Sequence, residues 1–106
     1  MGKFGHLLEI AGRAFEHKEA ALEQKMAEIR GSTLSEERKA RLLLKKESQL
    51  RIFQATRATS YYNAAAGFYN AGQKEKALAA AEKASFHPSL KEKAQELIAQ
   101  IKSKSE

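Results

Sequence analysis

The feature that most limits the possible folds is a long run of apolar residues that keeps one helical phase. These residues recur with a period of about 3.6 at the following positions: Leu43, Leu50, Phe53, Tyr61, Ala65 and Phe68. No proline lies between residues 35 and 71, and Gly67 is the only glycine there. The pattern predicts one helix over about residues 35–71, roughly 54 Å long at the usual rise per residue. The alternative is a break within residues 56–60, where β-branched and hydroxyl side chains cluster.

The composition of the whole chain also favours helices. Its 106 residues contain six glycines and one proline, Pro88, and they are rich in Ala, Glu, Lys, Leu and Gln. Such side chains lose little freedom in a helix and do not compete for backbone hydrogen bonds. Because a chain of this length forms one domain at most, we expect a single all-α domain over residues 1–106.

Three further helices are predicted around the long one. The first covers about residues 4–30 and has a heptad-like apolar stripe made of Phe4, Leu8, Ala11, Phe15, Leu22, Met26 and Ile29. Lys18 and Lys25 fall where a coiled coil has its second apolar position, so an imperfect seam is expected. The last two helices cover about residues 74–86 and 90–102 and are separated by Pro88. Residues 103–106 are expected to fray.

Capping signals mark the ends of these helices. Gly31 and Gly72 follow the first two helices and predict C-caps. Two stretches match the capping box that begins a helix, Thr33-Leu34-Ser35-Glu36 and Ser89-Leu90-Lys91-Glu92. We therefore divide the chain into an N-terminal helical hairpin region at residues 1–57 and, at residues 58–102, a second helical hairpin followed by a capping helix.

An uncharged stretch covers residues 58–72, although 30% of the chain is charged. Charged side chains are rarely buried without a partner. The absence of charge therefore predicts that this part of the long helix is covered on more than one side.

Large and small side chains follow a fixed order across residues 59–88. Tyr61 and Phe68 are the large residues, Gly72 opens a turn, and the small positions are filled by Ala64, Ala65, Ala77 and Ala84. With Pro88 at its end, this stretch resembles one tetratricopeptide repeat (TPR), a pair of antiparallel helices, followed by a capping helix. Ala81 departs from the pattern, because the family usually has a large aromatic residue there. About three repeats are needed for a stable stack, so residues 1–57, a second copy or a neighbouring segment must complete this one.

The resemblance implies a non-catalytic protein–protein interaction module, a scaffold or adaptor that binds a protein or peptide. In the family, a groove that holds peptides would be lined by Thr59, Tyr62, Asn63, Ala66, Tyr69 and Asn70. The competing interpretation is that the first helix packs there and fills the groove. Asn63 matches an asparagine with which chaperone-binding repeats hold a terminal carboxylate, but Ala64 stands in place of the neighbouring arginine.

A basic segment supports an alternative function. The net charge is +6, and residues 32–57 carry seven positive and three negative charges. The positive residues are Arg38, Lys39, Arg41, Lys45, Lys46, Arg51 and Arg57. They predict either a patch that binds nucleic acid or another polyanion, or simply a solvated helix face. No helix-turn-helix, zinc or RNA-binding signature accompanies them. A third alternative is a structural fragment of a longer helical-repeat protein.

Enzymatic, metal and membrane functions find no support in the sequence. There is no cysteine and no aspartate, and His6, His17 and His87 have no ligand spacing. No glycine-rich phosphate loop is present, so no cofactor is expected. No apolar run approaches the length of a membrane span, and Glu9 and Arg13 interrupt any signal peptide. A cytoplasmic location is expected.

Self-association through the long helices is a testable prediction. A helix of roughly 54 Å cannot be covered along its length by helices of roughly 20 Å. The first helix covers part of the remainder, but the ends of the stripe that contains Leu43, Leu50 and Phe53 would still be partly bare on a monomer. Two-fold pairing is the commonest solution. We expect light scattering at micromolar concentration to give the mass of a homodimer. A mass near 11.8 kDa would reject it and imply that the first helix folds back along the whole second helix.

Overall fold

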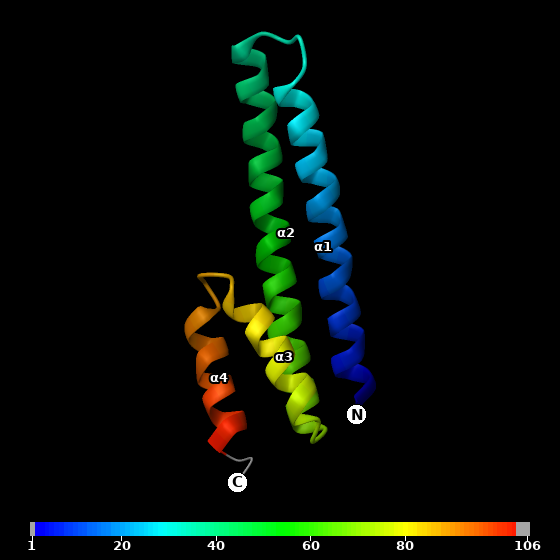
Figure 1. The fold of residues 1–106 in the computed structure, drawn as a ribbon, viewed down its shortest axis with the longest axis vertical. Helices are drawn as coiled ribbons and strands as arrows, with labels where there is room; N and C mark the ends of the chain where they lie inside the picture. The colour runs from blue at the N-terminus through cyan, green and yellow to red at the C-terminus, as the bar shows by residue number, and fades with distance from the viewer. Residues whose placement is uncertain (1, 104–106) are drawn as a thin grey trace.

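The computed structural model describes residues 2–103, and these form four α-helices and no strand. The helices are α1 (Gly2–Arg30), α2 (Glu36–Asn70), α3 (Lys74–Ser85) and α4 (Lys91–Ser103) (Figure 1). The all-α prediction is therefore confirmed. The tail that was expected to fray begins at Ser103, the last residue of α4, and residues 104–106 lie outside the described range.

The long helix is confirmed as one unbroken element. The hydroxyl of Thr56 donates to the carbonyl of Ile52 at 2.8 Å, and that of Thr59 to the carbonyl of Ala55 at 2.9 Å. The side chains that favoured a break thus bond to the preceding turn and leave the helix intact. The alternative of a break within residues 56–60 is wrong.

Gly72 ends α2 as predicted. It has a φ of +80°, and its N–H donates to the carbonyl of Tyr69 at 3.0 Å. The N–H of Gln73 donates to the carbonyl of Phe68 at 2.8 Å. This pair of bonds is a Schellman motif, which satisfies the last carbonyls of a helix and favours glycine at the left-handed position.

The other predicted caps need correction. Ser35, rather than Thr33, caps α2, since its side chain accepts from the N–H of Arg38 at 3.2 Å. The N–H of Gly31 donates to the carbonyl of Ala27 at 3.0 Å, but Gly31 has no positive φ. At the predicted cap before α4, the hydroxyl of Ser89 lies 2.7 Å from Nδ1 of His87. The helix itself begins at Lys91, two residues later.

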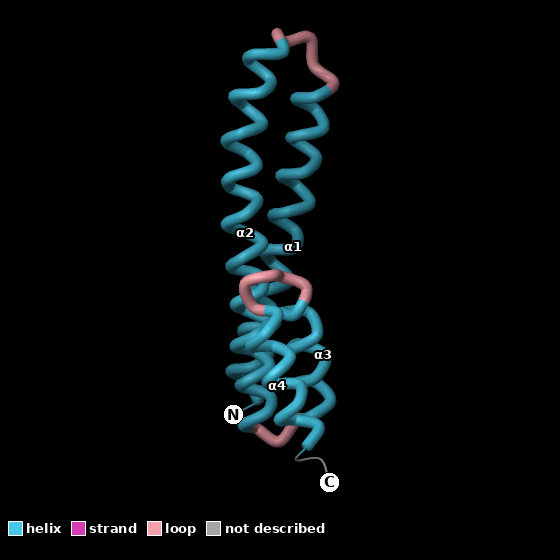
Figure 2. Tube along the Cα trace, turned by 90° about the vertical axis from the view of Figure 1, so that its left-hand side faces the viewer, coloured by secondary structure: helices cyan, strands magenta, loops and turns pink. Residues whose placement is uncertain are grey.

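The four helices form a rod with two unequal halves. α1 runs antiparallel to α2 along nearly its whole length, whereas α3 and α4 cover only the half of α2 near the chain termini (Figures 1 and 2). The molecule measures 60 × 25 × 15 Å, and its radius of gyration of 17.2 Å exceeds the ~13 Å of a compact chain of about this length. One half is therefore a four-helix body and the other a two-helix arm.

The core lies in the four-helix body and is built largely from alanine. Its main cluster takes residues from α2, α3 and α4: Ala64, Ala65, Phe68, Ala77, Ala80, Ala81, Leu97 and Ile101. Tyr61, Ala84 and Ala94 form a second cluster. The uncharged stretch of α2 is thus covered on more than one side, as predicted. Small side chains at these positions let the helix backbones approach closely.

The seam between α1 and α2 differs from the prediction at its second position. That row contains Gly5, Gly12, Glu19 and Met26, all of them buried. Lys18 and Lys25 are exposed and flank the seam instead. Phe4, expected in the stripe, is also exposed. A pattern of apolar side chains does not predict Gly5 and Gly12 as core positions. These glycines have no side chain and instead leave space for a neighbouring residue.

Each glycine of this row receives an aromatic ring from α2. A Cβ atom on Gly5 would lie 2.8 Å from Cδ1 of Phe68, and one on Gly12 would lie 2.8 Å from Cζ of Tyr61. On α3, Nζ of Lys76 lies 5.8 Å from the centroid of the Phe68 ring, and Nζ of Lys83 lies 4.9 Å from that of Tyr61. The two glycines are seven residues apart on α1, as are the two rings on α2 and the two lysines on α3. The three helices therefore pack in one shared register.

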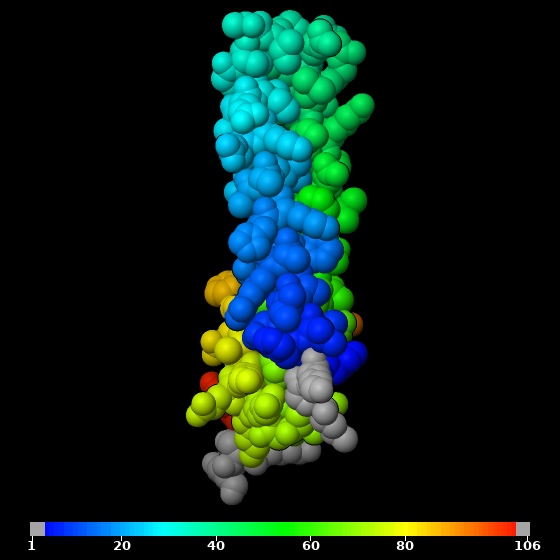
Figure 3. Space-filling view, turned by 90° about the vertical axis from the view of Figure 1, so that its right-hand side faces the viewer, coloured from blue at the N-terminus to red at the C-terminus, as the bar shows by residue number. Residues whose placement is uncertain are grey.

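The premise of the predicted homodimer does not hold in full. α1 lies alongside α2 in the arm (Figure 3), and Leu43, Leu50 and Phe53 of the stripe are half-buried. The ring centroid of Phe15 on α1 lies 5.9 Å from that of Phe53. A second copy is therefore not required to cover these side chains, and the oligomeric state stays a prediction.

We predict that Gly12→Ala destabilises the protein by ~1–3 kcal/mol through overpacking. The Tyr61 ring cannot move aside easily, because it is buried and its hydroxyl donates to Glu16 Oε1 at 2.8 Å. The matched control is Gly31→Ala, whose Cβ would meet no atom closer than 3.6 Å. Chemical denaturation measures both variants, and equal midpoints for the two would contradict this reading of the seam.

Candidate functional site

The structure brings parts of the two predicted site sets onto one face of α2. Residues seven apart in a helix lie on the same face. One such row contains Arg38, Lys45, Ile52, Thr59 and Ala66, and the next contains Leu42, Gln49, Thr56, Asn63 and Asn70. Candidate polyanion-binding residues thus occupy one end of this face, and candidate peptide-binding residues occupy the other.

A row on α1 continues this face across the seam. It contains Phe4, Leu7, Ala11, Ala14, Lys18, Ala21 and Lys25. A Cβ on Gly67 of α2 would lie 3.4 Å from Cδ1 of Phe4, which places the two rows side by side at this end. At the other end, Lys18 and Lys25 line a groove together with Lys46 and Gln49 of α2. We call the surface formed by these three rows and Lys46 the open face.

The end of the open face near Phe4 is apolar. Phe4 and Leu7 are each 63% exposed there, and Ile10, beside Leu7 on α1, is 46% exposed. Ile52 is also 63% exposed, but it lies farther along α2, next to Phe53 and at the level of Lys18. The hydroxyl protons of Thr56 and Thr59 are already donated to helix carbonyls, so these residues present mainly methyl groups. A cluster of exposed large apolar side chains is typical of an interaction surface.

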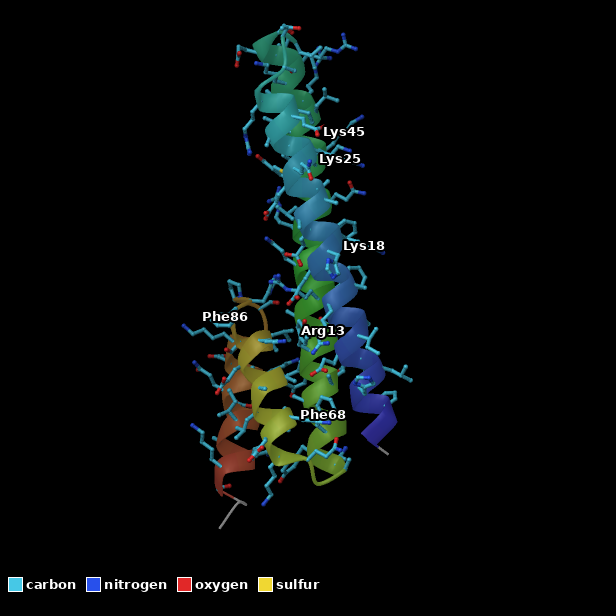
Figure 4. All side chains as sticks on the ribbon, turned by 45° about the vertical axis from the view of Figure 1, so that its right-hand side comes forward. Arg13, Lys18, Lys25, Lys45, Phe68 and Phe86 are labelled. Atoms are coloured by element: carbon cyan, nitrogen blue, oxygen red, sulfur yellow. The ribbon has the colours of Figure 1, made fainter. Side chains whose placement is uncertain are left out.

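The other end of the open face is cationic. The groove there has a volume of about 280 Å³ and is lined by Lys18, Ala21, Leu22, Lys25, Lys46, Gln49 and Phe53. Nζ of Lys18 lies 4.9 Å from the ring centroid of Phe15. Lys18, Lys25 and Lys45 follow one another along the two-helix arm (Figure 4). Within residues 2–103, neither these three lysines nor Lys46 lies within 4.0 Å of a carboxylate.

The predicted polyanion patch is not one continuous surface. Nη1 of Arg57 donates to Oε1 of Glu19 at 2.9 Å in the α1–α2 interface. Nζ of Lys39 donates to the carbonyl of Arg30 at 3.1 Å. Arg51 is seven residues before the buried Ala58 and lies on the side of α2 that faces α3 and α4. Helical geometry separates these residues from Arg38 and Lys45, although all belong to one basic segment.

The predicted peptide groove also divides. Tyr62 and Tyr69 are half-buried and pack against the main core cluster, which α3 and α4 help to form. Thr59, Asn63 and Asn70 remain exposed. α1 lies against Tyr61, Gly67 and Phe68, next to this surface rather than over it. The six residues therefore do not line one open groove, and α1 does not fill a groove between them. The two tyrosines face the core, while Thr59, Asn63 and Asn70 face outward.

A buried ion pair lies within the α1–α2 interface. The side chain of Glu19 is 8% exposed, and its Oε2 has no hydrogen-bond partner among the described residues. Burial raises the pKa of Glu19, the Arg57 guanidinium lowers it, and the charges of Glu16 and Glu23 raise it further, with a net upward shift. Burial and the bond to Glu16 likewise raise the pKa of Tyr61.

Other kinds of site are not formed by the described residues. In residues 2–103, no three His or Glu side chains come together in a group that could hold a metal ion. None of the helices in this range is long and apolar enough to cross a membrane. Phe86 is 81% exposed at the end of α3, but it lies away from the open face, on the opposite side of α2 from Lys18 (Figure 4).

Comparisons of the chain with protein-family models, with curated proteins and with solved structures gave no match. The resemblance to a tetratricopeptide repeat therefore rests on the residues named above.

We predict that Glu19→Gln raises the melting temperature at pH 7. A carboxyl whose pKa is raised by folding contributes stability below its unfolded pKa, near 4.5, and loses it as the pH rises through the folded pKa. The neutral amide removes that loss, so the difference from the unsubstituted protein should shrink towards pH 4. Thermal unfolding at pH 4 and pH 7 measures it, with Glu47→Gln on the exposed surface of α2 as control. A lower melting temperature at pH 7 would show instead that the pairing with Arg57 dominates.

Proposed function

We propose that this protein is a non-catalytic protein–protein interaction module that binds a protein or peptide partner on the open face. The observation that carries the proposal is the exposure of Phe4, Leu7 and Ile52 on one side of a hairpin. The same two helices bury small residues such as Gly5, Gly12 and Ala64 on their inner sides. Large apolar side chains that stay exposed on a hairpin with a buried inner side favour a surface that packs against another protein.

The polar residues of the open face fit the same role. Asn63 and Asn70 are exposed on α2 beside the apolar end, and their amides can both donate and accept hydrogen bonds. Polar groups around an apolar centre are typical of transient interfaces. A scaffold or adaptor related in principle to tetratricopeptide repeats would use its helices in this way.

A second candidate function, binding of nucleic acid or another polyanion, is favoured by the unpaired lysines of the arm. Phosphate contacts make binding fall steeply with salt concentration, with a log–log slope of about −0.9 for each phosphate contacted on duplex DNA. An interface centred on Phe4 and Leu7 would depend less on salt. In a salt titration, a slope of several units for duplex DNA would therefore support the second function, whereas an apolar interface with a few ion pairs would give a shallower slope.

We predict that Leu7→Glu weakens capture of the partner by about tenfold or more, since a hot-spot residue contributes ~2 kcal/mol or more. The chain offers a matched control in Leu44, which is 61% exposed on α2. It lies two heptads before Ala58, on the side of α2 that faces α3 and α4 lower down. Leu44→Glu should change capture by less than about twofold.

The measurement is quantitative affinity capture from the native cell extract, with a photo-crosslinker at residue 7 or 44 to report direct contact. Equal losses for the two variants, or crosslinks at residue 44 alone, would contradict binding on the open face.

A further inference from the structure

We propose that the partner segment is an acidic amphipathic helix that lies in the groove between α1 and α2. Its apolar side chains would contact Phe4 and Leu7, and its carboxylates would contact Lys18, Lys25 and Lys46. This inference rests on the proposed function and specifies the chemistry of the partner.

The shape of the open face suits a helix. Two antiparallel helices leave a groove along their seam, and a third helix placed there packs its side chains between theirs. The α1 row from Phe4 to Lys25 covers 21 residue steps, which is roughly 31 Å along the axis. A partner helix of about 20 residues would match that length.

The charges of the groove select an acidic partner. Lys18 and Lys25 are seven residues apart, or roughly 10 Å along α1, so glutamates seven residues apart on a partner helix would face both. Lys46 reaches the same groove from α2. The protein's own carboxylates do not neutralise them, since Glu9 pairs with Arg13 at 3.3 Å and Glu19 with Arg57 at 2.9 Å. Glu28 is the one acid that follows in the same row.

A second copy of the chain is a poor occupant of this groove. In a parallel arrangement the lysines of the two copies would face each other. In an antiparallel arrangement the lysines of one copy would face Phe4 and Leu7 of the other. Neither arrangement supplies carboxylates to Lys18 and Lys25, whereas like charges brought together in an interface oppose binding.

Nucleic acid is also disfavoured by the distribution of charge. The unpaired lysines occupy only one end of the open face, and the other end is apolar. A phosphate backbone would leave Phe4 and Leu7 without a complementary surface. Recognition of single strands relies on aromatic side chains that stack with bases, but Phe15 and Phe53 near Lys18 are half-buried between the helices.

The test uses the full chain and two synthetic helical peptides of about 20 residues, the length that matches the groove. Both carry leucines spaced by three and four residues at one end. The other end carries glutamates seven residues apart in the first peptide and glutamines in the second. Fluorescence anisotropy at physiological salt should show the acidic peptide binding about tenfold more tightly, a difference of ~1.4 kcal/mol.

Charge-reversal variants locate the site. The double variant Lys18→Glu, Lys25→Glu should lower affinity for the acidic peptide by about tenfold or more. The control Lys91→Glu, Lys93→Glu changes the net charge equally on the exposed side of α4 and should change affinity by less than about twofold. Far-UV circular dichroism checks that both variants fold, and Lys18→Gln, Lys25→Gln repeats the test without introducing acids.

Three results would overturn the inference. Equal affinity for the two peptides, with both lost in Leu7→Glu, would reject the acidic partner and leave the proposed function standing. Failure of both peptides to bind would also reject it, while crosslinking at residue 7 tests the proposed function independently. Tighter binding of a 20-base-pair duplex than of the acidic peptide, with the same dependence on Lys18 and Lys25, would favour the polyanion function instead.

Discussion

Two aromatic rings on α2, those of Tyr61 and Phe68, determine how α1 and α3 are placed. Each ring fills the space that a glycine leaves on α1 and has the Nζ atom of an α3 lysine 4.9 or 5.8 Å from its centroid. A buried ring has few alternative positions, because protein interiors are packed nearly as densely as organic crystals. The alanines of the core then follow, since helices held this close leave no room for larger side chains. The close approach of α1 and α2 thus depends on Gly5 and Gly12 as well as on the two rings.

The same contacts explain why the two halves of the molecule differ. Where α3 and α4 are present, α2 is covered on two sides and its exposed residues are few. In the arm, α1 and α2 have only each other, and Leu43, Leu50 and Phe53 stay half-buried. The open face runs across both halves because neither α3 nor α4 reaches that side of the hairpin. Its apolar end lies over the four-helix body, and its cationic end lies on the arm.

Much of the fold could be predicted from sequence because it depends on local patterns. Three features depend only on neighbouring residues and are present in the structure: the continuous phase of α2, the buried alanines of α3 and the turn at Gly72. The α1 seam could not be predicted fully, since Gly5 and Gly12 show no apolar side chain and their role depends on residues about 50–60 positions away. The same limit applies to the sites. Lys45 and Arg57 belong to one basic segment of the sequence. They point in different directions around α2, so Lys45 is exposed whereas Arg57 pairs with Glu19 in the interface. Tyr62 was expected to be accessible, because the sequence of α2 does not show on which of its sides α3 and α4 pack.

The shared seven-residue register has a consequence for how the chain can vary in length. Seven residues advance a helix by roughly 10 Å and return its faces almost to their starting direction. Seven residues added to the arm part of α1, matched by seven in the arm part of α2, would therefore leave Gly5, Gly12, Tyr61 and Phe68 in contact. An unmatched addition of one residue to α2 would rotate everything beyond it by roughly 100°. The arm is thus a part of the molecule whose reach is adjustable in steps, while the four-helix body is fixed.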